Sequence, residues 1–272
     1  MRRVLTAAVL APLVLALVMF APQVLITLVV AAVGALAGWE FLGLAEHCGA
    51  KPPRFAVMAA VLALFAGNYQ WPDQTLIILG ALSLSLVACC TFRTPVERVL
   101  LDACSSVFAL FYIGLTLLAI PTLRAQTNGP SLVIFLLFVV WAGDITALYV
   151  GRLWGKKKMA PAISPNKTWV GAVGSVLGSV LVTVGLYWLS LQLVQWNFTK
   201  LSFTEEAWWY WLVMAVVVNV AAQVGDLAES ALKRSAGVKD SGSLLPGHGG
   251  VLDRIDALLI AAPVLWWLQA LR

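Results

Sequence analysis

Charged residues are scarce in this sequence. Only 11% of the 272 residues are Asp, Glu, Lys or Arg, while 61% are hydrophobic. A soluble domain carries about 25% charged residues and about half apolar residues. A soluble protein of this length could not bury so much apolar surface in one core. The composition therefore excludes an ordinary soluble domain and indicates an integral membrane protein.

Side chains that bind transition metals or form disulfides are also few. The chain has two histidines and four cysteines, and no two cysteines form a C-x-x-C pair. All four cysteines lie in or beside apolar runs, whereas zinc sites and disulfide frameworks use cysteines at characteristic spacings. We therefore expect neither, and we interpret the four cysteines as small buried hydrophobic residues.

Long apolar runs dominate instead. A membrane-crossing helix needs about 20 apolar residues. Nine candidates run approximately over residues 4–20, 23–45, 55–70, 74–92, 99–120, 131–152, 170–194, 207–228 and 254–271. The first resembles a signal peptide, but its length and the apolar run that follows favour a retained span. The third and the ninth are short and could be tilted, buried or re-entrant. We predict an all-α, polytopic membrane helical bundle with about nine transmembrane helices.

The basic residues indicate the orientation of this bundle. If the N-terminus is cytoplasmic, 15 Lys and Arg residues fall on the inner side, and only Arg124, Lys200 and Arg272 fall on the outer side. This asymmetry obeys the positive-inside rule and predicts a cytoplasmic N-terminus for a protein that we expect in a bacterial-type inner (plasma) membrane. It also accounts for the net charge of +5 without nucleic acid. Five tryptophans fall where an outer aromatic belt is expected: Trp71, Trp196, Trp208, Trp209 and Trp211.

The two halves of the sequence differ. Residues 1–130 are mostly apolar helices with short loops, which we interpret as a scaffold for the bundle and for a dimer. Residues 131–272 hold two long inner loops and most of the unusual polar residues. We therefore expect the catalytic transmembrane region, with two cytoplasmic loops, at 131–272.

Seven carboxylates lie within or at the inner ends of predicted spans, where each costs about 2.5–3.5 kcal/mol at the centre of a membrane helix. For Glu40 and Asp102 we favour ion pairs that hold helices together. The other five flank the basic inner loops: Asp144, Asp226, Glu229, Asp253 and Asp256.

The spacing of these five indicates a metal site. Asp226 and Glu229 are three residues apart, as are Asp253 and Asp256, so each pair shares one helix face. Two helices that present carboxylates at one depth form an all-oxygen site suited to Mg²⁺. We therefore predict that Asp226, Asp253, Asp256 and Asp144 bind Mg²⁺.

Both inner loops carry features of phosphate binding. Residues 233–254 combine basic side chains with glycines, whose backbone N–H groups can approach phosphate oxygens closely. Residues 164–168 precede the seventh span, whose N-terminus is suited to an anion. An ordinary helix cap with topogenic charge is the alternative for this second segment. The run Lys156-Lys157-Lys158 is interpreted as topogenic and attracted to anionic lipid.

Three segments resemble one family. Residues 230–256 contain S-x-x-K-R, K-D, P-x-H-G-G and D-R-x-D, and this string is similar to the signature of the phosphatidate cytidylyltransferases, also called CDP-diacylglycerol synthases. Residues 223–230 resemble the family's Q-x-G-D-L-x-E-S. Residues 141–152 and 164–168 also fit. The resemblance covers residues 141–256 strongly and leaves the first half as generic spans.

The resemblance implies a dimeric, membrane-embedded helical enzyme that converts CTP and phosphatidic acid to CDP-diacylglycerol and pyrophosphate with Mg²⁺. It makes Asp226 and Asp253 the principal metal ligands, supported by Asp256 and Asp144. A second cation such as K⁺ is associated with the family's metal site.

We assign site residues on this basis. The catalytic set is Asp226, Asp253, Asp256, Lys233, Arg234, Lys239, Asp240 and His248. The substrate-binding set is Ser164, Asn166, Lys167, Thr168, Ser230, Gly249, Gly250 and Arg254. His248 is expected to position phosphate or its loop rather than to act as acid or base. The alternatives are a CTP-dependent enzyme with another lipid acceptor and a transporter of an anionic lipid or nucleotide.

Overall fold

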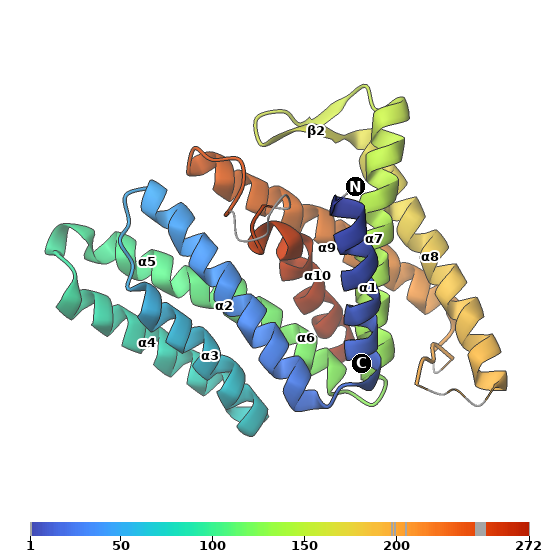
Figure 1. Cartoon of the computed structure of the whole chain (residues 1–272), viewed down its shortest axis with the longest axis horizontal. Coiled ribbons are helices and arrows are strands. Elements are labelled where there is room, and N and C mark those ends of the chain that lie inside the picture. Colours follow the sequence, from blue (N-terminus) through green and yellow to red (C-terminus); the bar gives the residue numbers. More distant parts are fainter. Residues whose placement is uncertain (1, 197, 199, 205, 243–248, 272) are drawn as a thin grey trace. The chain divides into compact units, whose positions relative to one another are not determined.

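The computed structural model describes residues 2–196, 198, 200–204, 206–242 and 249–271 (Figure 1). The chain divides into two compact units. The first comprises Met1–Val9, Pro22–Pro121 and Leu232–Ile255, and the second comprises Leu10–Ala21, Thr122–Ala231 and Asp256–Arg272.

The first unit is built on adjacent helices. They are α2 (Gln23–His47), α3 (Arg54–Gln70), α4 (Thr75–Arg93) and α5 (Val99–Ala109), with the short 3₁₀ turns η1 (Pro72–Gln74) and η2 (Val96–Arg98) before α4 and α5. In Figure 1, α2 packs against α3, α3 against α4 and α4 against α5. The helix α5 continues through a π-helical segment, η3 (Leu110–Leu115), into α6 (Thr116–Arg124). The predicted fifth span is therefore one helical segment of 29 residues, Val96–Arg124.

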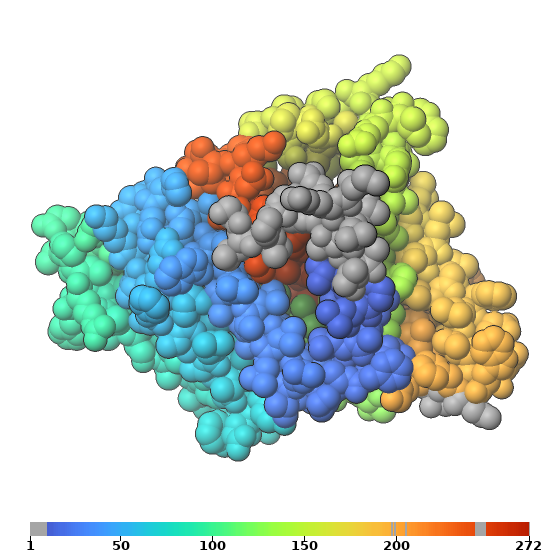
Figure 2. Space-filling model, viewed as in Figure 1, coloured from blue at the N-terminus to red at the C-terminus, as the bar shows by residue number. Residues whose placement is uncertain are grey.

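The core of this unit is aliphatic and aromatic. Leu64, Phe65, Leu110 and Ile113 are at most 1% exposed. In Figure 2 the blue to green atoms of α2 to α5 form one packed surface, as expected for close-packed side chains.

The cysteines do not all join this core. Cys90 is fully buried, whereas Cys48 and Cys104 are exposed. The prediction of buried cysteines is right for Cys90 and wrong for Cys48 and Cys104. Cys48 follows the last residue of α2, and Cys104 lies on an outward face of α5, while Cys89 is half-buried.

The second unit contains four long helices and a hairpin. These helices are α7 (Gly129–Trp154), α8 (Trp169–Gln195), most of α9 (Trp208–Ser235) and most of α10 (Leu252–Ala270), and the unit also includes part of α1 (Arg2–Phe20). Strands β1 (Lys158–Ala160) and β2 (Ser164–Thr168) pair antiparallel, with Lys158 opposite Thr168. The inner loop that the sequence places at 152–169 thus contains a short β-hairpin. The sequence does not predict this hairpin, because the loop shows no alternation of apolar and polar residues.

Close packing in this unit depends on small residues and one aromatic cluster. A Cβ at Gly174 of α8 would lie 2.7 Å from Val150 Cβ of α7, so the glycine allows the two helices to approach. Trp211 packs edge-to-face on Phe135 and Phe203 and donates its Nε1–H to the Phe203 carbonyl at 2.8 Å. Trp211 is 2% exposed and is a core residue rather than a belt residue, whereas the other four predicted belt tryptophans are exposed.

In the described part of the chain, six helical segments are long and apolar enough to cross a membrane. They are Gln23–His47, Pro72–Arg93, Val96–Arg124, Gly129–Trp154, Trp169–Gln195 and Trp208–Ser235. The prediction of an all-α polytopic membrane fold is confirmed. The predicted first, third and ninth spans are also helical, as α1, α3 and α10. The chain is an integral membrane protein.

Candidate functional site

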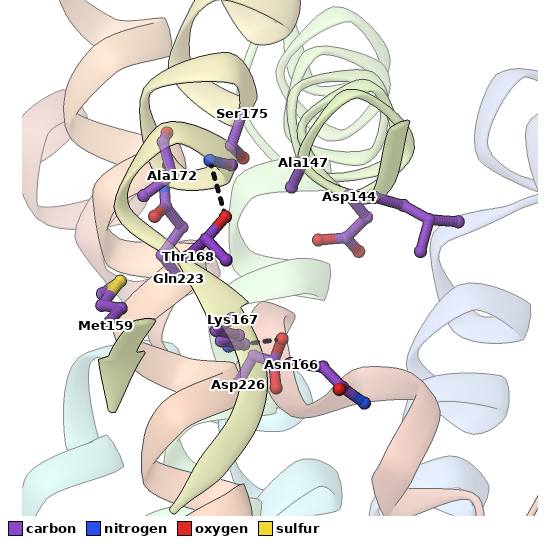
Figure 3. A pocket seen from close by; sticks show the side chains of 12 residues that line it. Asp144, Ala147, Met159, Asn166, Lys167, Thr168, Ala172, Ser175, Gln223 and Asp226 are labelled. Carbon is purple, nitrogen blue, oxygen red and sulfur yellow. Dashed lines mark hydrogen bonds and ion pairs between the residues drawn. The ribbon is translucent and has the colours of Figure 1, made fainter. Parts of the chain in front are cut away.

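A pocket of about 260 Å³ lies in the second unit, between α7, the hairpin, α8 and α9 (Figure 3). Its lining residues are Asp144, Ala147 and Leu148 of α7, Met159 of β1, Asn166, Lys167 and Thr168 of β2, Gly171, Ala172 and Ser175 of α8, and Gln223 and Asp226 of α9. Five of the predicted site residues therefore meet in one pocket, although they are spread over more than 80 positions of the sequence.

The charged groups of this pocket face one another. The Lys167 Nζ lies 2.6 Å from the Asp226 Oδ2, and the two side chains are 24% and 34% exposed. The Ser230 hydroxyl donates to the Asp226 Oδ1 at 3.4 Å, which is a long hydrogen bond. Asp144 lines the pocket from α7 (Figure 3). The pocket thus presents one ammonium and two carboxylates to a ligand.

The strand β2 runs directly into α8, and Thr168 forms the junction. Its Oγ1 accepts the Gly171 N–H at 3.1 Å, which is the usual N-cap hydrogen bond. The cap fixes the start of α8, so that Lys167 is held two residues before the helix and directly before its N-cap. The helix-cap interpretation is therefore right for Thr168. The neighbouring Lys167 is not part of the cap, and its ammonium group forms an ion pair with Asp226.

A chain of hydrogen bonds backs the pocket. The Gln223 Nε2 donates to Asn219 Oδ1 at 2.7 Å and to the Ala172 carbonyl at 3.2 Å. The Asn219 Nδ2 donates to Ser175 Oγ at 2.9 Å and to Ser179 Oγ at 2.8 Å. Buried polar groups in an apolar helix bundle need hydrogen-bond partners. Here the polar groups of α9 find them on α8, so the bonds join the two helices.

Gln223 and Ser175 were not predicted to line a site. Two amide side chains four residues apart, at 219 and 223, interrupt an apolar span. Polar residues at that spacing share one helix face and could have predicted a polar site there.

A second predicted metal ligand, Asp253 at the start of α10, lies in the first unit and has different surroundings from Asp226. The Asp253 Oδ1 accepts the Lys233 Nζ at 2.6 Å. The Oδ2 accepts the backbone N–H groups of Gly250 at 2.8 Å and of Ser241 at 3.1 Å. The Asp253 side chain is only 8% exposed. The Gly250 N–H, predicted to approach a phosphate, is directed at a carboxylate of the chain itself.

Comparison with known proteins gives the family. A model of the cytidylyltransferase family matches residues 1–271 of the chain. The chain belongs to the cytidylyltransferase family. This assignment confirms the resemblance drawn from residues 141–256.

Curated relatives of this chain agree with the family assignment. It is 44% identical over 163 residues to the phosphatidate cytidylyltransferase of Brucella abortus biovar 1 (strain 9-941), which is 60% of this chain and 56% of the relative. It is 37% identical over 165 residues to the phosphatidate cytidylyltransferase of Staphylococcus saprophyticus, which is 61% of this chain and 58% of the relative. The matched part therefore spans a little over half the length of these relatives.

The other predicted site residues in the described part of the chain lie outside the pocket lining. Ser164 begins β2, and the Arg234 Nη1 donates to the Val238 carbonyl at 2.8 Å. The Asp256 Oδ1 accepts the Ala257 N–H at 2.8 Å. Lys239, Asp240 and Arg254 are exposed. His248 lies outside the described residues.

The predicted metal ligands are divided between the units, with Asp253 in the first and Asp144, Asp226 and Asp256 in the second. No group of three or more His, Cys, Asp or Glu side chains suited to a metal is found in the described part of the chain. The four-carboxylate magnesium site therefore stays a prediction. The donors of the second-unit pocket still fit Mg²⁺, because its described lining offers carboxylate and amide oxygens and neither thiol nor imidazole.

Proposed function

We propose that this family member is a phosphatidate cytidylyltransferase that makes CDP-diacylglycerol and pyrophosphate from CTP and phosphatidic acid. The observation that carries this proposal is the second-unit pocket, in which Lys167, Asp226 and Asp144 meet beside the start of α8. We further propose that the enzyme is a homodimer in a bacterial-type inner membrane, with its active site on the cytoplasmic side.

The chemistry requires little proton transfer. The second pKa of a phosphomonoester is about 6, so phosphatidic acid already offers an anionic oxygen near neutral pH. That oxygen attacks the α-phosphorus of CTP and forms a new P–O bond. The bond between the α-phosphorus and the oxygen bridging to the β-phosphorus breaks, and pyrophosphate leaves with that electron pair.

The difficulty is electrostatic, because two anions must meet. Lys167 supplies a positive charge at the pocket, and the adjacent N-terminus of α8 adds a partial positive charge. A phosphate that takes Lys167 as its partner leaves the Asp226 carboxylate available. Asp226 and Asp144 would then hold Mg²⁺, which when bound neutralises charge on nucleotide phosphates. Asp253, Asp256 and a second cation such as K⁺ remain part of this proposal.

The test is a purified, full-length enzyme in lipid nanodiscs with Mg²⁺ and CTP labelled on the α-phosphate. Phosphatidic acid, an isoprenoid alcohol and an archaeal-type lipid are supplied as separate acceptors. The proposal expects labelled CDP-diacylglycerol and one pyrophosphate per product, with phosphatidic acid alone. Turnover with another acceptor only would favour the related CTP-dependent enzyme. Label uptake into sealed vesicles without chemical change would favour the transporter.

A further inference from the structure

Glu40 is a buried carboxylate in α2 of the first unit, and it is 4% exposed. The Oε1 accepts the Val251 N–H at 3.0 Å. The Oε2 accepts the Leu252 N–H at 2.9 Å and the Ser241 hydroxyl at 3.0 Å. Among the described residues it makes no ion pair, so the interhelical ion pair expected from the sequence is wrong.

These contacts make Glu40 a cap for a different helix. The first N–H groups of a helix have no partner within it, and a negative charge there is stabilised by the helix dipole. A residue of the same helix usually supplies the cap. Here α10 begins at Leu252, and the carboxylate comes from α2, 212 positions earlier.

The same short segments also bind Asp253. Ser241 donates its hydroxyl to Glu40 and its N–H to Asp253. Gly250 donates its N–H to Asp253, and a Cβ there would contact Ser241 Oγ and Glu40 Oε2. Ser241 therefore contacts both carboxylates, and the backbone donors of Asp253 and Glu40 come from the same two short segments, so loss of either carboxylate changes the surroundings of the other.

We infer that Glu40 is a positioning residue for cytidylyl transfer. It holds Ser241 and the start of α10, and so fixes the direction of the Asp253 carboxylate. This role rests on the proposed function, because Asp253 is one of its expected metal ligands. Glu40 itself contacts backbone and hydroxyl groups of the chain and no reacting atom.

The test compares Glu40→Gln with Glu46→Gln, a change at an exposed carboxylate on the same helix. The amide of Gln presents donors to Leu252 N–H and Ser241, where acceptors are needed. Loss of a residue that orients a ligand costs about 10- to 100-fold in activity. In the full-length protein we expect a fall of that size in kcat and little change in KM for phosphatidic acid. We also expect faster hydrogen exchange at the Val251 and Leu252 amides, while Glu46→Gln leaves all three quantities as in the wild type.

A folded Glu40→Gln enzyme with wild-type kcat, or with lowered kcat and fully protected Val251 and Leu252 amides, would overturn the inference. If Glu40→Gln does not fold, Ser241→Ala decides, because it removes one donor to Glu40 and keeps the Ser241 N–H to Asp253. We expect Ser241→Ala to lower kcat by a smaller factor than the one expected for Glu40→Gln. An unchanged kcat in Ser241→Ala would refute the positioning role of Glu40. A wild-type protein that makes no CDP-diacylglycerol refutes the proposed function, while the exchange measurement still decides whether Glu40 holds the start of α10.

Discussion

Two aspartates that resemble one another in sequence have different surroundings in the two units. Asp253 has an 8% exposed side chain and accepts Lys233 and two backbone N–H groups. Asp226 has a 34% exposed side chain, one ion pair with Lys167 and one long hydrogen bond. Each carboxylate is paired with a lysine at 2.6 Å.

The difference shows that pairing alone does not define a binding group. The donors of Asp253 are mostly backbone, and they cannot leave without movement of residues 241 and 250. The partner of Asp226 is a single flexible side chain beside a pocket, which a phosphate could attract. Asp226 is thus more accessible to a ligand, whereas Asp253 is held more firmly by the chain itself.

From this comparison of the two aspartates, we expect the largest loss in the free energy of unfolding when Asp253 is replaced. Asp253→Asn replaces an acceptor by a donor and removes an enclosed partner of Lys233, and breaking a buried ion pair costs about 3–5 kcal/mol. Chemical denaturation in detergent should therefore show a loss of that order in the free energy of unfolding. Asp73→Asn, at an exposed position of the same unit, is the control. An Asp253→Asn protein as stable as the wild type would remove the distinction between the two aspartates.

Asp226→Asn should separate activity from stability. The Lys167–Asp226 ion pair is partly exposed, and solvent-accessible pairs contribute about 0–1 kcal/mol, so we expect the unfolding free energy to change by about that much. Turnover should nevertheless fall about 10²- to 10³-fold, the usual loss when one group that stabilises developing charge is removed. The measurement is kcat per folded protein, with folding judged by gel filtration and denaturation. Full activity in folded Asp226→Asn would show that the pocket carboxylate binds nothing essential.

Two glycines with positive φ test how tightly Asp253 is enclosed. Gly237 has φ +71° and no atom within 4 Å of the position that a Cβ would take, whereas a Cβ at Gly249, with φ +81°, would lie 2.7 Å from Asp253 Oδ2. Both alanine variants bear the left-handed strain of about 1–2 kcal/mol. Gly249→Ala should lose about 1–3 kcal/mol more in the free energy of unfolding, because it also overpacks the carboxylate. Equal losses in chemical denaturation would mean that Asp253 moves away freely.

The smallest effect is expected at Lys167. Lys167→Ala should raise KM for CTP about tenfold, equivalent to about 1.4 kcal/mol of binding free energy. Stability should be nearly unchanged, and Lys167→Arg should retain most of the affinity because it keeps the charge. An unaltered kcat/KM for CTP in Lys167→Ala would return this residue to a purely topogenic role.

The helical membrane fold could be read from the sequence because each span is a long apolar run with its own signal. The grouping of these five pocket residues could be anticipated because Asp144 and Asp226 lie in the inner parts of their predicted spans, and Asn166, Lys167 and Thr168 lie in the inner loop before the seventh span. The hydrogen-bond partners of the buried carboxylates could not be anticipated. Asp102, expected in an ion pair, accepts the backbone N–H of Lys51 at 2.6 Å. Backbone donors carry no sequence identity, so a pattern of side chains does not reveal them.

The cap that Glu40 provides for α10 has a consequence for the order of assembly. The acceptor and its donors are separated by 211 and 212 positions. At a synthesis rate of about 5–20 residues per second, Glu40 waits about 10–40 s for the Val251 and Leu252 amides to be made. During that interval its carboxylate lies in an inserted helix without its final partners. The first unit is therefore complete only after the start of α10 has been made, and a truncated chain that ends before α10 would leave the Glu40 carboxylate in α2 without the Val251 and Leu252 donors.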